Sequence, residues 1–258
     1  MPSDDIAAAP NAPQLAIFTD FDGTLVEIAE TPDGVEVPDS LAPQLERTAR
    51  ELDSAFAVIT GREISDIDRY LAPLHLPVAG AHGTQRRRAD GVVETVDPAA
   101  ITGAAEIAEA LSPLVMAHPS LIIETKEGAV ALHYRQAPEL ENAVRIAMEE
   151  AVLGVPGFTL VPGKMVLEAR PAGANKGTAL RAFMREVPFV GRTPIFIGDD
   201  TTDEDGFIAA QELGGVGIKL GEGETAARMR IANVASVHAL IKGLGDIAAR
   251  DREKTVTH

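Results

Sequence analysis

Acidic side chains are concentrated in two short segments of this sequence. The first is Asp20-Phe21-Asp22-Gly23-Thr24-Leu25, and the second, GDDTTDED at 198–205, holds five carboxylates between Asp199 and Asp205. Carboxylates held this close repel one another unless a proton or a cation joins them. Because oxygen ligands suit Mg²⁺, the two segments predict a site for a hard divalent cation. The alternative for each is an acidic turn or helix start that faces solvent.

Two further strings could bind a phosphate group. Thr60-Gly61-Arg62 offers a hydroxyl, backbone amides at the start of a helix, and a guanidinium that can grip a phosphate with two N–H groups. Asn175-Lys176-Gly177 opens another helix. A lysine there, beside clustered carboxylates, would neutralise both them and a phosphoryl group. The alternatives are an ordinary helix cap with a turn for the first string and a surface charge for the second.

Short apolar segments precede these strings and must place them. Residues 14–19, 55–60 and 193–198 are apolar runs that end in polar residues or glycine, as strands buried on both faces do. Further strands are expected at 76–80 and 215–218, and helices at 39–52, 63–71, 176–185 and 202–213. Strands that alternate with helices predict a parallel sheet. Ligands of such sheets bind at the carboxyl ends of the strands, where Asp20 and Asp199 lie.

The middle of the chain has a different pattern, in which a helix followed by a hairpin is expected twice. These elements are a helix at 104–116 with strands at 121–125 and 129–135, then a helix at 138–153 with strands at 158–161 and 165–169. The sequence therefore predicts an α+β domain at 84–172, inserted into an α/β core made of residues 1–83 and 173–258.

The composition limits the classes of protein that fit. The chain has 258 residues, no cysteine and a formal charge of −16. This length allows one large or two modest domains, and the lack of cysteine excludes disulfides and thiolate metal sites. The negative charge argues against binding to nucleic acid or to an anionic membrane. Since the N-terminal residues lack the pattern of a signal peptide and we identify no run of about 20 apolar residues, we expect a cytoplasmic protein.

In this order and spacing, the four strings resemble the haloacid dehalogenase superfamily of Mg²⁺-dependent phosphatases. Other strings resemble, more narrowly, its trehalose-6-phosphate phosphatase family; they are Gly80-Ala81-His82-Gly83, Glu124-x-Lys126, His133-Tyr134-Arg135 and Glu168-x-Arg170-Pro171. The resemblance covers about residues 15–220 and implies a haloacid-dehalogenase-like Rossmannoid core with an inserted α+β cap. It also implies hydrolysis of trehalose 6-phosphate with Mg²⁺ as cofactor. The tail after Leu220 carries no motif.

The resemblance further implies a role for each residue of the four strings. Asp20 would be the nucleophile that forms an aspartyl-phosphate, and Asp22 the general acid and base. The residues that would bind the phosphoryl end of the substrate are Thr60, Gly61, Arg62, Asn175 and Lys176. The residues that would hold Mg²⁺ are Asp20, Asp22 through its backbone carbonyl, Asp199 and, as a weaker candidate, Asp203.

By the same resemblance, the sugar would be bound by side chains of the insertion together with His82 of the core. The insertion residues are Glu124, Lys126, Arg135, Glu168 and Arg170. The alternative is a set of ion pairs on a solvated hairpin, because residues two apart on a strand, such as Glu124 and Lys126, share a face. We interpret His133 as a structural histidine and Arg86-Arg87-Arg88 as a solvated hairpin edge.

Other functions stay open at this point. They are a phosphatase for sucrose 6-phosphate or mannosyl-3-phosphoglycerate, a sugar phosphomutase and, outside enzymes, a module that binds a divalent cation. The resemblance also implies a functional link to a trehalose-phosphate synthase. Residues 20–39 and 199–205 hold seven and five carboxylates and no basic residue. A phosphate dianion therefore needs a cation to reverse the local charge, and we expect metal binding to precede productive substrate binding.

Overall fold

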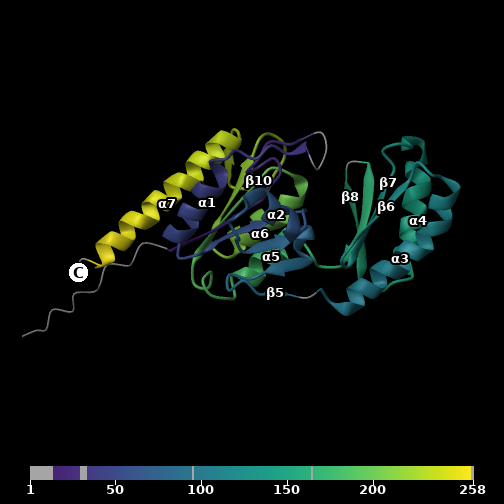
Figure 1. The fold of residues 1–258 in the computed structure, drawn as a ribbon, viewed down its shortest axis with the longest axis horizontal. Helices are drawn as coiled ribbons and strands as arrows, with labels where there is room; N and C mark the ends of the chain where they lie inside the picture. Colours follow the sequence, from purple (N-terminus) through teal and green to yellow (C-terminus); the bar gives the residue numbers. More distant parts are fainter. Residues whose placement is uncertain (1–13, 30–33, 95, 164, 257–258) are drawn as a thin grey trace, which may run out of the picture. The chain divides into compact units, whose positions relative to one another are not determined.

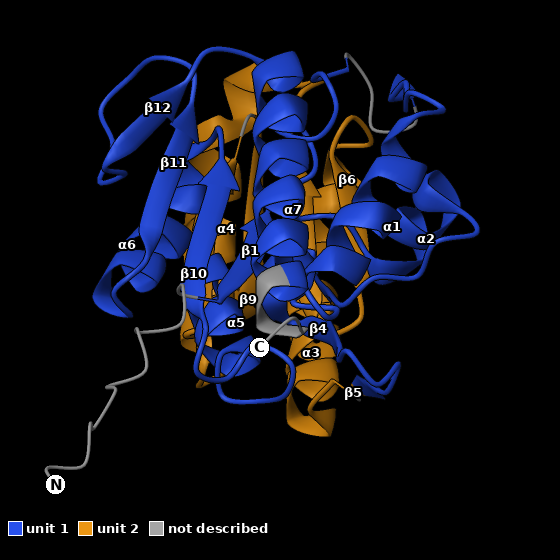
Figure 2. Ribbon diagram, turned by 90° about the vertical axis from the view of Figure 1, so that its left-hand side faces the viewer, with its two compact units in different colours: residues 1–93, 175–258 blue, residues 94–174 orange. Residues whose placement is uncertain are grey.

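The chain forms two compact units, which Figure 2 colours separately. The computed structural model describes residues 14–29, 34–94, 96–163 and 165–256. Unit 1 comprises Met1–Val93 and Asn175–His258, and unit 2 comprises Glu94–Ala174. Unit 2 begins later than the insertion that we predict at 84–172: residues 85–87 form a strand in the sheet of unit 1, and the short strand at 93–94 joins the same sheet where the chain passes into unit 2.

Within the described residues, the sheet of unit 1 has eight strands (Figure 1). Their spatial order is β12 (Met229–Ile231), β11 (Val216–Leu220), β10 (Thr193–Gly198), β1 (Leu15–Thr19), β2 (Phe56–Ile59), β3 (Val78–Gly80), β4 (Gln85–Arg87) and β5 (Val93–Glu94). The pairings from β12 to β3 are parallel, and β4 is antiparallel to β3. The predicted α/β architecture with a parallel sheet is confirmed.

Helices accompany the parallel strands of unit 1, and all but the last helix lead into the next strand of the sheet. They are α1 (Leu41–Glu51), α2 (Ile64–Leu71), α5 (Lys176–Phe183), α6 (Glu204–Glu212) and α7 (Val234–Val256), with short 3₁₀ turns η2 (Ala81–Gly83) and η4 (Thr201–Asp203). On one side of β1, helix α1 connects β1 to its neighbour β2. On the other side, helix α6 connects β10 to β11. Right-handed crossovers in opposite directions place α1 and α6 on opposite faces. In addition, α1 packs against α7, and α5 packs against α6.

The core of unit 1 is built on strands that are buried along their whole length. Ala16, Ile17 and Phe18 of β1 and every residue of β2 have no exposed surface. The ring of Phe18 stacks on Phe189 at 5.3 Å between centroids, and Phe189 also packs against Phe183 at 5.2 Å. Because both faces are covered, these strands appear in the sequence as continuous apolar runs rather than as alternating patterns.

Unit 2 is an antiparallel sheet packed against two helices. The strand order is β6 (Ile122–Lys126), β7 (Ala129–His133), β9 (Val166–Pro171) and β8 (Phe158–Gly163), and the helical elements are α3 (Pro98–Ala117), η3 (Pro138–Leu140) and α4 (Glu141–Leu153). Val130 and Leu132 of β7 point into the core, with Ile107 and Leu111 of α3 and Met148 of α4. The twofold helix-and-hairpin pattern predicted from the sequence matches this order.

One described helix, α3, is long and apolar enough by length and composition to cross a membrane. Its apolar side packs into the core of unit 2, where Ile107 and Leu111 are fully buried. Its charged residues Glu106 and Glu109 lie on the exposed side. This amphipathic arrangement is typical of a helix that covers one face of a sheet.

Unit 1 contains one part for which no structure is predicted from the sequence and one that differs from its prediction. The tail after Leu220 forms β12 and the long helix α7, whose Val237 and Ile241 are fully buried. Arg87, predicted on a solvated hairpin edge, is only 8% exposed; it makes two hydrogen bonds of 2.7 Å to Asp68 and one of 2.9 Å to the Leu76 carbonyl. The carboxylate compensates the buried charge, so a run of three arginines can contribute a strand to the sheet.

The aromatic cluster gives a direct test of the core. Truncation of Phe189, which has no exposed surface, should leave a cavity between Phe18 and Phe183 and lower the free energy of unfolding by about 3–5 kcal/mol in Phe189→Ala. Urea denaturation followed by circular dichroism measures this change. The neighbouring Val190 is 53% exposed, so Val190→Ala should change stability by less than about 0.5 kcal/mol. Equal effects of the two substitutions would contradict this description of the core.

Candidate active site

The carboxyl ends of β1 and β10 bring the two predicted acidic segments together. The strands are parallel neighbours, with Thr19 opposite Ile197, so Asp20 and Asp199 follow adjacent strand ends. Strand β1 lies between β2, the next strand of the chain, and β10, which comes much later in the chain, so the strand order reverses at β1. Such a reversal of strand order opens the crevice in which α/β proteins bind ligands.

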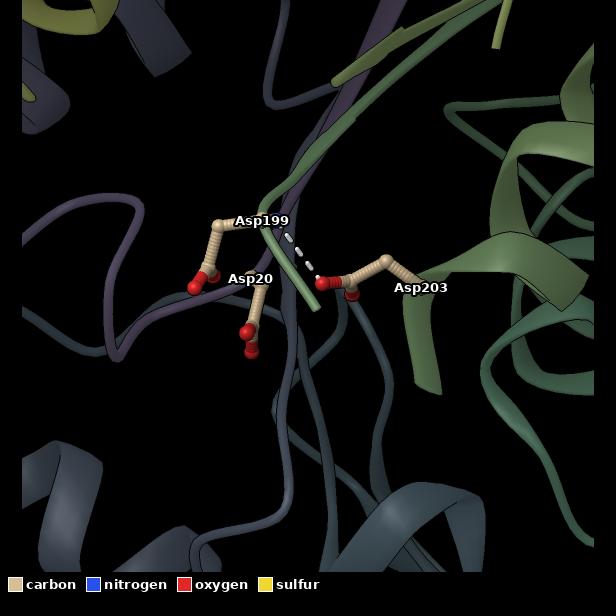
Figure 3. Close-up of side chains that lie close together, drawn as sticks. All are labelled: Asp20, Asp199 and Asp203. Atoms are coloured by element: carbon tan, nitrogen blue, oxygen red, sulfur yellow. Dashed lines mark hydrogen bonds between the residues drawn. The ribbon is translucent and has the colours of Figure 1, made fainter. Parts of the chain in front are cut away.

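Asp20, Asp199 and Asp203 form an acidic cluster at this edge (Figure 3). One carboxylate oxygen from each residue lies within 4.8 Å of the others. Asp20 is 6% exposed and Asp203 is fully buried. Three carboxylates and no nitrogen or sulfur ligand are the donor set that a hard cation such as Mg²⁺ prefers, so the residues fit the predicted metal.

The members of the acidic cluster are not equivalent. Asp203 Oδ2 accepts hydrogen bonds of 2.9 Å from the backbone N–H groups of Asp199 and Asp200, the first of which is drawn in Figure 3. Its other oxygen, Oδ1, accepts from Lys176 at 2.7 Å. Since both oxygens of Asp203 already have partners, Asp20 and Asp199 are the better candidates for direct ligands. Asp203, the weaker candidate of the sequence, therefore stays a prediction as a ligand.

Lys176 supplies a positive charge inside the acidic cluster. Its side chain is 3% exposed, and Nζ lies 3.0 Å from Asp20 Oδ1 and 2.7 Å from Asp203 Oδ1. Burial disfavours the ammonium ion, but these two carboxylates outweigh that effect and hold the pKa of Lys176 above its ordinary value. Asn175 fixes the lysine at the start of α5, because its side-chain oxygen accepts a hydrogen bond of 2.8 Å from the Thr178 N–H.

Three carboxylates around one ammonium leave a deficit of positive charge. Burial raises the pKa of Asp20 to about 8; Lys176 opposes this rise, while Asp203 and Asp199 add to it. Burial also raises the pKa of Asp199 to about 6, against the hydrogen bond from Thr24. Without a metal ion, the acidic cluster therefore holds a proton near neutral pH, which a divalent cation would displace.

Asp22 and Arg62, for which the sequence predicts separate roles, are bound to each other. The guanidinium donates two hydrogen bonds of 2.7 Å, from Nε to Oδ2 and from Nη2 to Oδ1 of the carboxylate. Arg62 also lies over the ring of Tyr70, 5.0 Å from its centroid. The side chain of Asp22 is thus held by Arg62, while its neighbour Asp20 belongs to the acidic cluster.

The other predicted phosphate ligands lie on a tight loop after β2. Thr60 is 1% exposed, and its hydroxyl accepts a hydrogen bond of 3.2 Å from the Arg62 N–H. The ring of His82 packs on Gly61, where an added Cβ would stand 2.7 Å from two ring atoms. The backbone N–H of His82 donates to the Thr60 carbonyl at 2.9 Å. His82 therefore shapes the loop that carries Thr60 and Arg62.

Three residues that the sequence analysis did not assign hold Asp199 in place. Thr24 donates a hydrogen bond of 2.9 Å to Asp199 Oδ1, and Lys219 on β11 donates one of 2.6 Å to its backbone carbonyl. Gly23 has a φ of +74°, and a Cβ there would lie 2.1 Å from Asp199 Oδ2. A lysine inside the apolar run Val216–Leu220 is an indication that could have identified Lys219, which is 5% exposed.

Most of the predicted sugar-binding residues share one face of the sheet in unit 2. Glu124 lies opposite Ala131, and Ala131 lies opposite Glu168. Lys126 Nζ stands 3.3 Å from Glu168 and 3.9 Å from Glu124, while Arg170 lies 3.9 Å from Glu168. Arg135 is placed differently, in the exposed turn after β7.

Comparisons with known proteins agree on one family. The sequence model of the trehalose-phosphatase family matches residues 18–235. The chain is 41% identical over 239 residues to the trehalose-6-phosphate phosphatase of Escherichia coli K12, covering 92% of this chain and 89% of that protein. It is 42% identical over 229 residues to a probable trehalose-phosphate phosphatase of Sinorhizobium fredii, covering 87% and 84%. A crystal structure of a trehalose-6-phosphate phosphatase related protein, 29% identical, superposes with a TM-score of 0.74 over 92% of this chain and 99% of that chain.

The acidic cluster predicts that Mg²⁺ binding releases protons. Since the pKa of Asp20 is raised to about 8, roughly one proton per bound ion should be released at pH 7 and far less at pH 9. Titration calorimetry in two buffers with different ionisation enthalpies measures this number. Asp20→Asn should abolish the release, whereas substitution of an exposed acid, Asp90→Asn, should preserve it. Equal proton release at the two pH values would contradict the assignment of the proton to Asp20.

Proposed function

The chain belongs to the trehalose-phosphatase family, and on that premise we propose that it hydrolyses trehalose 6-phosphate to trehalose and phosphate, with Mg²⁺ as cofactor and Asp20 as nucleophile. The observation that carries this proposal is that the buried Asp20 and Lys176 and the partly exposed Asp199 lie together at the ends of adjacent strands. It combines a carboxylate that can attack phosphorus, an oxygen-only cation site and an ammonium group for the phosphoryl oxygens.

The proposed reaction has two displacements at phosphorus. In the first, a carboxylate oxygen of Asp20 attacks the phosphorus atom, the bond from phosphorus to the sugar oxygen breaks, and Asp22 gives its proton to that oxygen. In the second, Asp22 takes a proton from water as the water oxygen attacks the same phosphorus atom. The bond from phosphorus to Asp20 then breaks, which releases phosphate and restores the carboxylate.

The hydrogen-bonded pair of Asp22 and Arg62 must separate before Asp22 can transfer a proton, and the substrate phosphate would cause this separation. While both oxygens of Asp22 accept hydrogen bonds from the guanidinium of Arg62, the carboxyl group is not free to give a proton to the leaving sugar oxygen. A phosphate dianion offers the same guanidinium a stronger partner. Transfer of Arg62 to the substrate phosphate, beside the Thr60 hydroxyl, would free Asp22 to take up a proton from solvent and deliver it to the leaving oxygen.

The proposed metal ligands are Asp20, the backbone carbonyl of Asp22 and Asp199, while Asp203 orients the loop and Lys176. Bound there, Mg²⁺ would offset the charge of the carboxylates and of the phosphoryl group. Lys176 already neutralises part of this charge. Two independent sources of positive charge make it possible for a dianion to enter a site that carries three carboxylates.

Residues of unit 2 are proposed to select the sugar. Glu124, Lys126 and Glu168 present carboxylate and ammonium groups on one face, and such groups bind sugar hydroxyls. Arg170 shares this face, and Arg135 is available in the following turn; His82, in unit 1, is proposed as a further substrate-binding residue. Asn175 is proposed to act chiefly by capping α5, because its side-chain oxygen already accepts a hydrogen bond.

The proposed activity also sets a place in metabolism. Its substrate must come from a reaction that joins two glucose units while retaining the 6-phosphate, so we propose a functional link to a trehalose-phosphate synthase. We propose further that the protein works in the cytoplasm, as the sequence predicts.

Activity on two sugar phosphates tests the proposal. With Mg²⁺, the protein should release phosphate from trehalose 6-phosphate with a kcat/KM at least about 100-fold above that for glucose 6-phosphate, and chelation should abolish both activities. Asp20→Asn should lower kcat by about 1,000-fold or more, because no carboxylate remains to attack phosphorus. Exposed Asp90→Asn is the matched control. A preference for sucrose 6-phosphate or mannosyl-3-phosphoglycerate in the same assay, or intact turnover in Asp20→Asn, would overturn the proposal.

Substitution of Glu168 tests the assignment of the sugar site. Glu168→Gln keeps the size of the side chain but removes the charge that binds Lys126 and the sugar hydroxyls, so KM for trehalose 6-phosphate should rise about tenfold. The ratio of kcat/KM for trehalose 6-phosphate to that for p-nitrophenyl phosphate should fall by a similar factor. Glu127→Gln, in the exposed turn between β6 and β7, should leave the ratio unchanged. Equal losses on both substrates in Glu168→Gln would place Glu168 outside sugar recognition.

A further inference from the structure

His133 stands at the end of β7 on the same face as the charged residues of unit 2. The strand register places Ala131 between Glu124 and Glu168, and His133 follows two residues later on that face. Its register partners are Ile122 on β6 and Val166 on β9. Because both partners are apolar, neither offers the imidazole a hydrogen-bond acceptor, whereas a diagonal neighbour on the same face can.

That acceptor is the carboxylate of Glu124. His133 donates a hydrogen bond of 2.8 Å from Nε2 to Glu124 Oε2; the direction follows because an ionised carboxylate can only accept. This hydrogen bond is the largest cause that lowers the pKa of the Glu124 carboxyl group, with a further contribution from Lys126. The contact therefore does two things: it joins the two side chains by a hydrogen bond, and it lowers the pKa of the Glu124 carboxyl group.

The two oxygens of Glu124 have different surroundings. Oε1 lies 3.9 Å from Lys126 Nζ, which is closer to Glu168, at 3.3 Å. The Glu124 side chain is 48% exposed, so packing alone does not fix its three torsion angles. Without a second contact, Glu124 would rotate in solvent or collapse onto Lys126, and the distance between the two carboxylates of this face would be lost.

We propose that His133 is a positioning residue for substrate recognition: its hydrogen bond to Glu124 Oε2 holds that carboxylate at a fixed place on the face shared with Lys126 and Glu168. This inference rests on the proposed function, in which Glu124 contacts the sugar. It extends that function by assigning a role to a histidine that the sequence suggests is only structural. Positioning of this kind raises affinity because the carboxylate is ordered before the sugar arrives.

The test compares three variants in the full-length protein with Mg²⁺. His133→Ala removes the donor and should raise KM for trehalose 6-phosphate about tenfold while kcat changes less than threefold. His133→Gln places an amide N–H close to the position of Nε2 and should restore KM to within about threefold of the wild-type value. His118→Ala removes a histidine of the same unit, at the end of α3, and should leave KM unchanged.

Combination with Glu124→Gln shows whether His133 acts through Glu124. If it does, His133→Ala should add less than about twofold to KM in the Glu124→Gln background, because the partner has already been changed. An unchanged KM in His133→Ala, full additivity with Glu124→Gln, or equal losses in His133→Ala and His133→Gln would each overturn the inference.

A second measurement separates this inference from the proposed function. If the wild-type protein released no phosphate from trehalose 6-phosphate, the proposed function would fail, and the contact would be judged by the pKa of the Glu124 carboxyl group, measured by carbon NMR without substrate. That pKa should rise in His133→Ala, because the hydrogen bond that lowers it is lost, and stay at its wild-type value in His118→Ala. An unchanged value in His133→Ala would overturn the inference whatever the substrate.

Discussion

Three carboxylates that share one buried ammonium are the constraint on which unit 1 depends. Asp20 and Asp203 are held around Lys176 with almost no exposure, and Asp199 completes a set that carries more negative than positive charge. Burial of such an imbalance costs free energy that hydrophobic packing elsewhere must offset. The same imbalance would favour the binding of a cation, so the least favourable feature of the fold is also the one suited to chemistry.

The surroundings of the acidic cluster are explained by this constraint. Backbone N–H groups from η4 and the side chain of Lys176 occupy both oxygens of Asp203, and Lys219 reaches across from β11 to the carbonyl of Asp199. Position 23 requires glycine, because its φ is +74° and because a Cβ there would lie 2.1 Å from Asp199 Oδ2. Each of these features keeps like charges apart by a fixed distance, which a flexible loop could not do.

The sequence was sufficient to predict features that depend on local pattern. Buried strands such as Leu15–Thr19 and Thr193–Gly198 are continuous apolar runs, and the motifs that follow them point to the acidic cluster before any coordinates are known. Features that depend on distant partners could not be predicted in the same way. The strand with Arg87 is stabilised by Asp68 on another element, and Arg62 binds Asp22 across 40 positions of the chain. By contrast, the buried positions of α7, such as Val237 and Ile241, follow a helical period that the sequence does contain.

The two units differ in the balance between their acidic and basic side chains. In the acidic cluster of unit 1, Asp20 and Asp203 are buried, Asp199 is partly exposed, and the three carboxylates outnumber Lys176. An added positive charge would offset this excess and favour a charged phosphoryl group. On the face of unit 2, Lys126 and Arg170 balance Glu124 and Glu168, and the Glu124 side chain stays 48% exposed. A balanced and partly hydrated face has no net preference for an ion, but it offers donors and acceptors at fixed spacing, which is what a neutral molecule rich in hydroxyl groups requires. Specificity for hydroxyl groups depends on the position of each hydrogen-bonding partner rather than on the net charge of the face. The fixed position that we propose His133 gives to the Glu124 carboxylate therefore matters more on this face than an additional charge would.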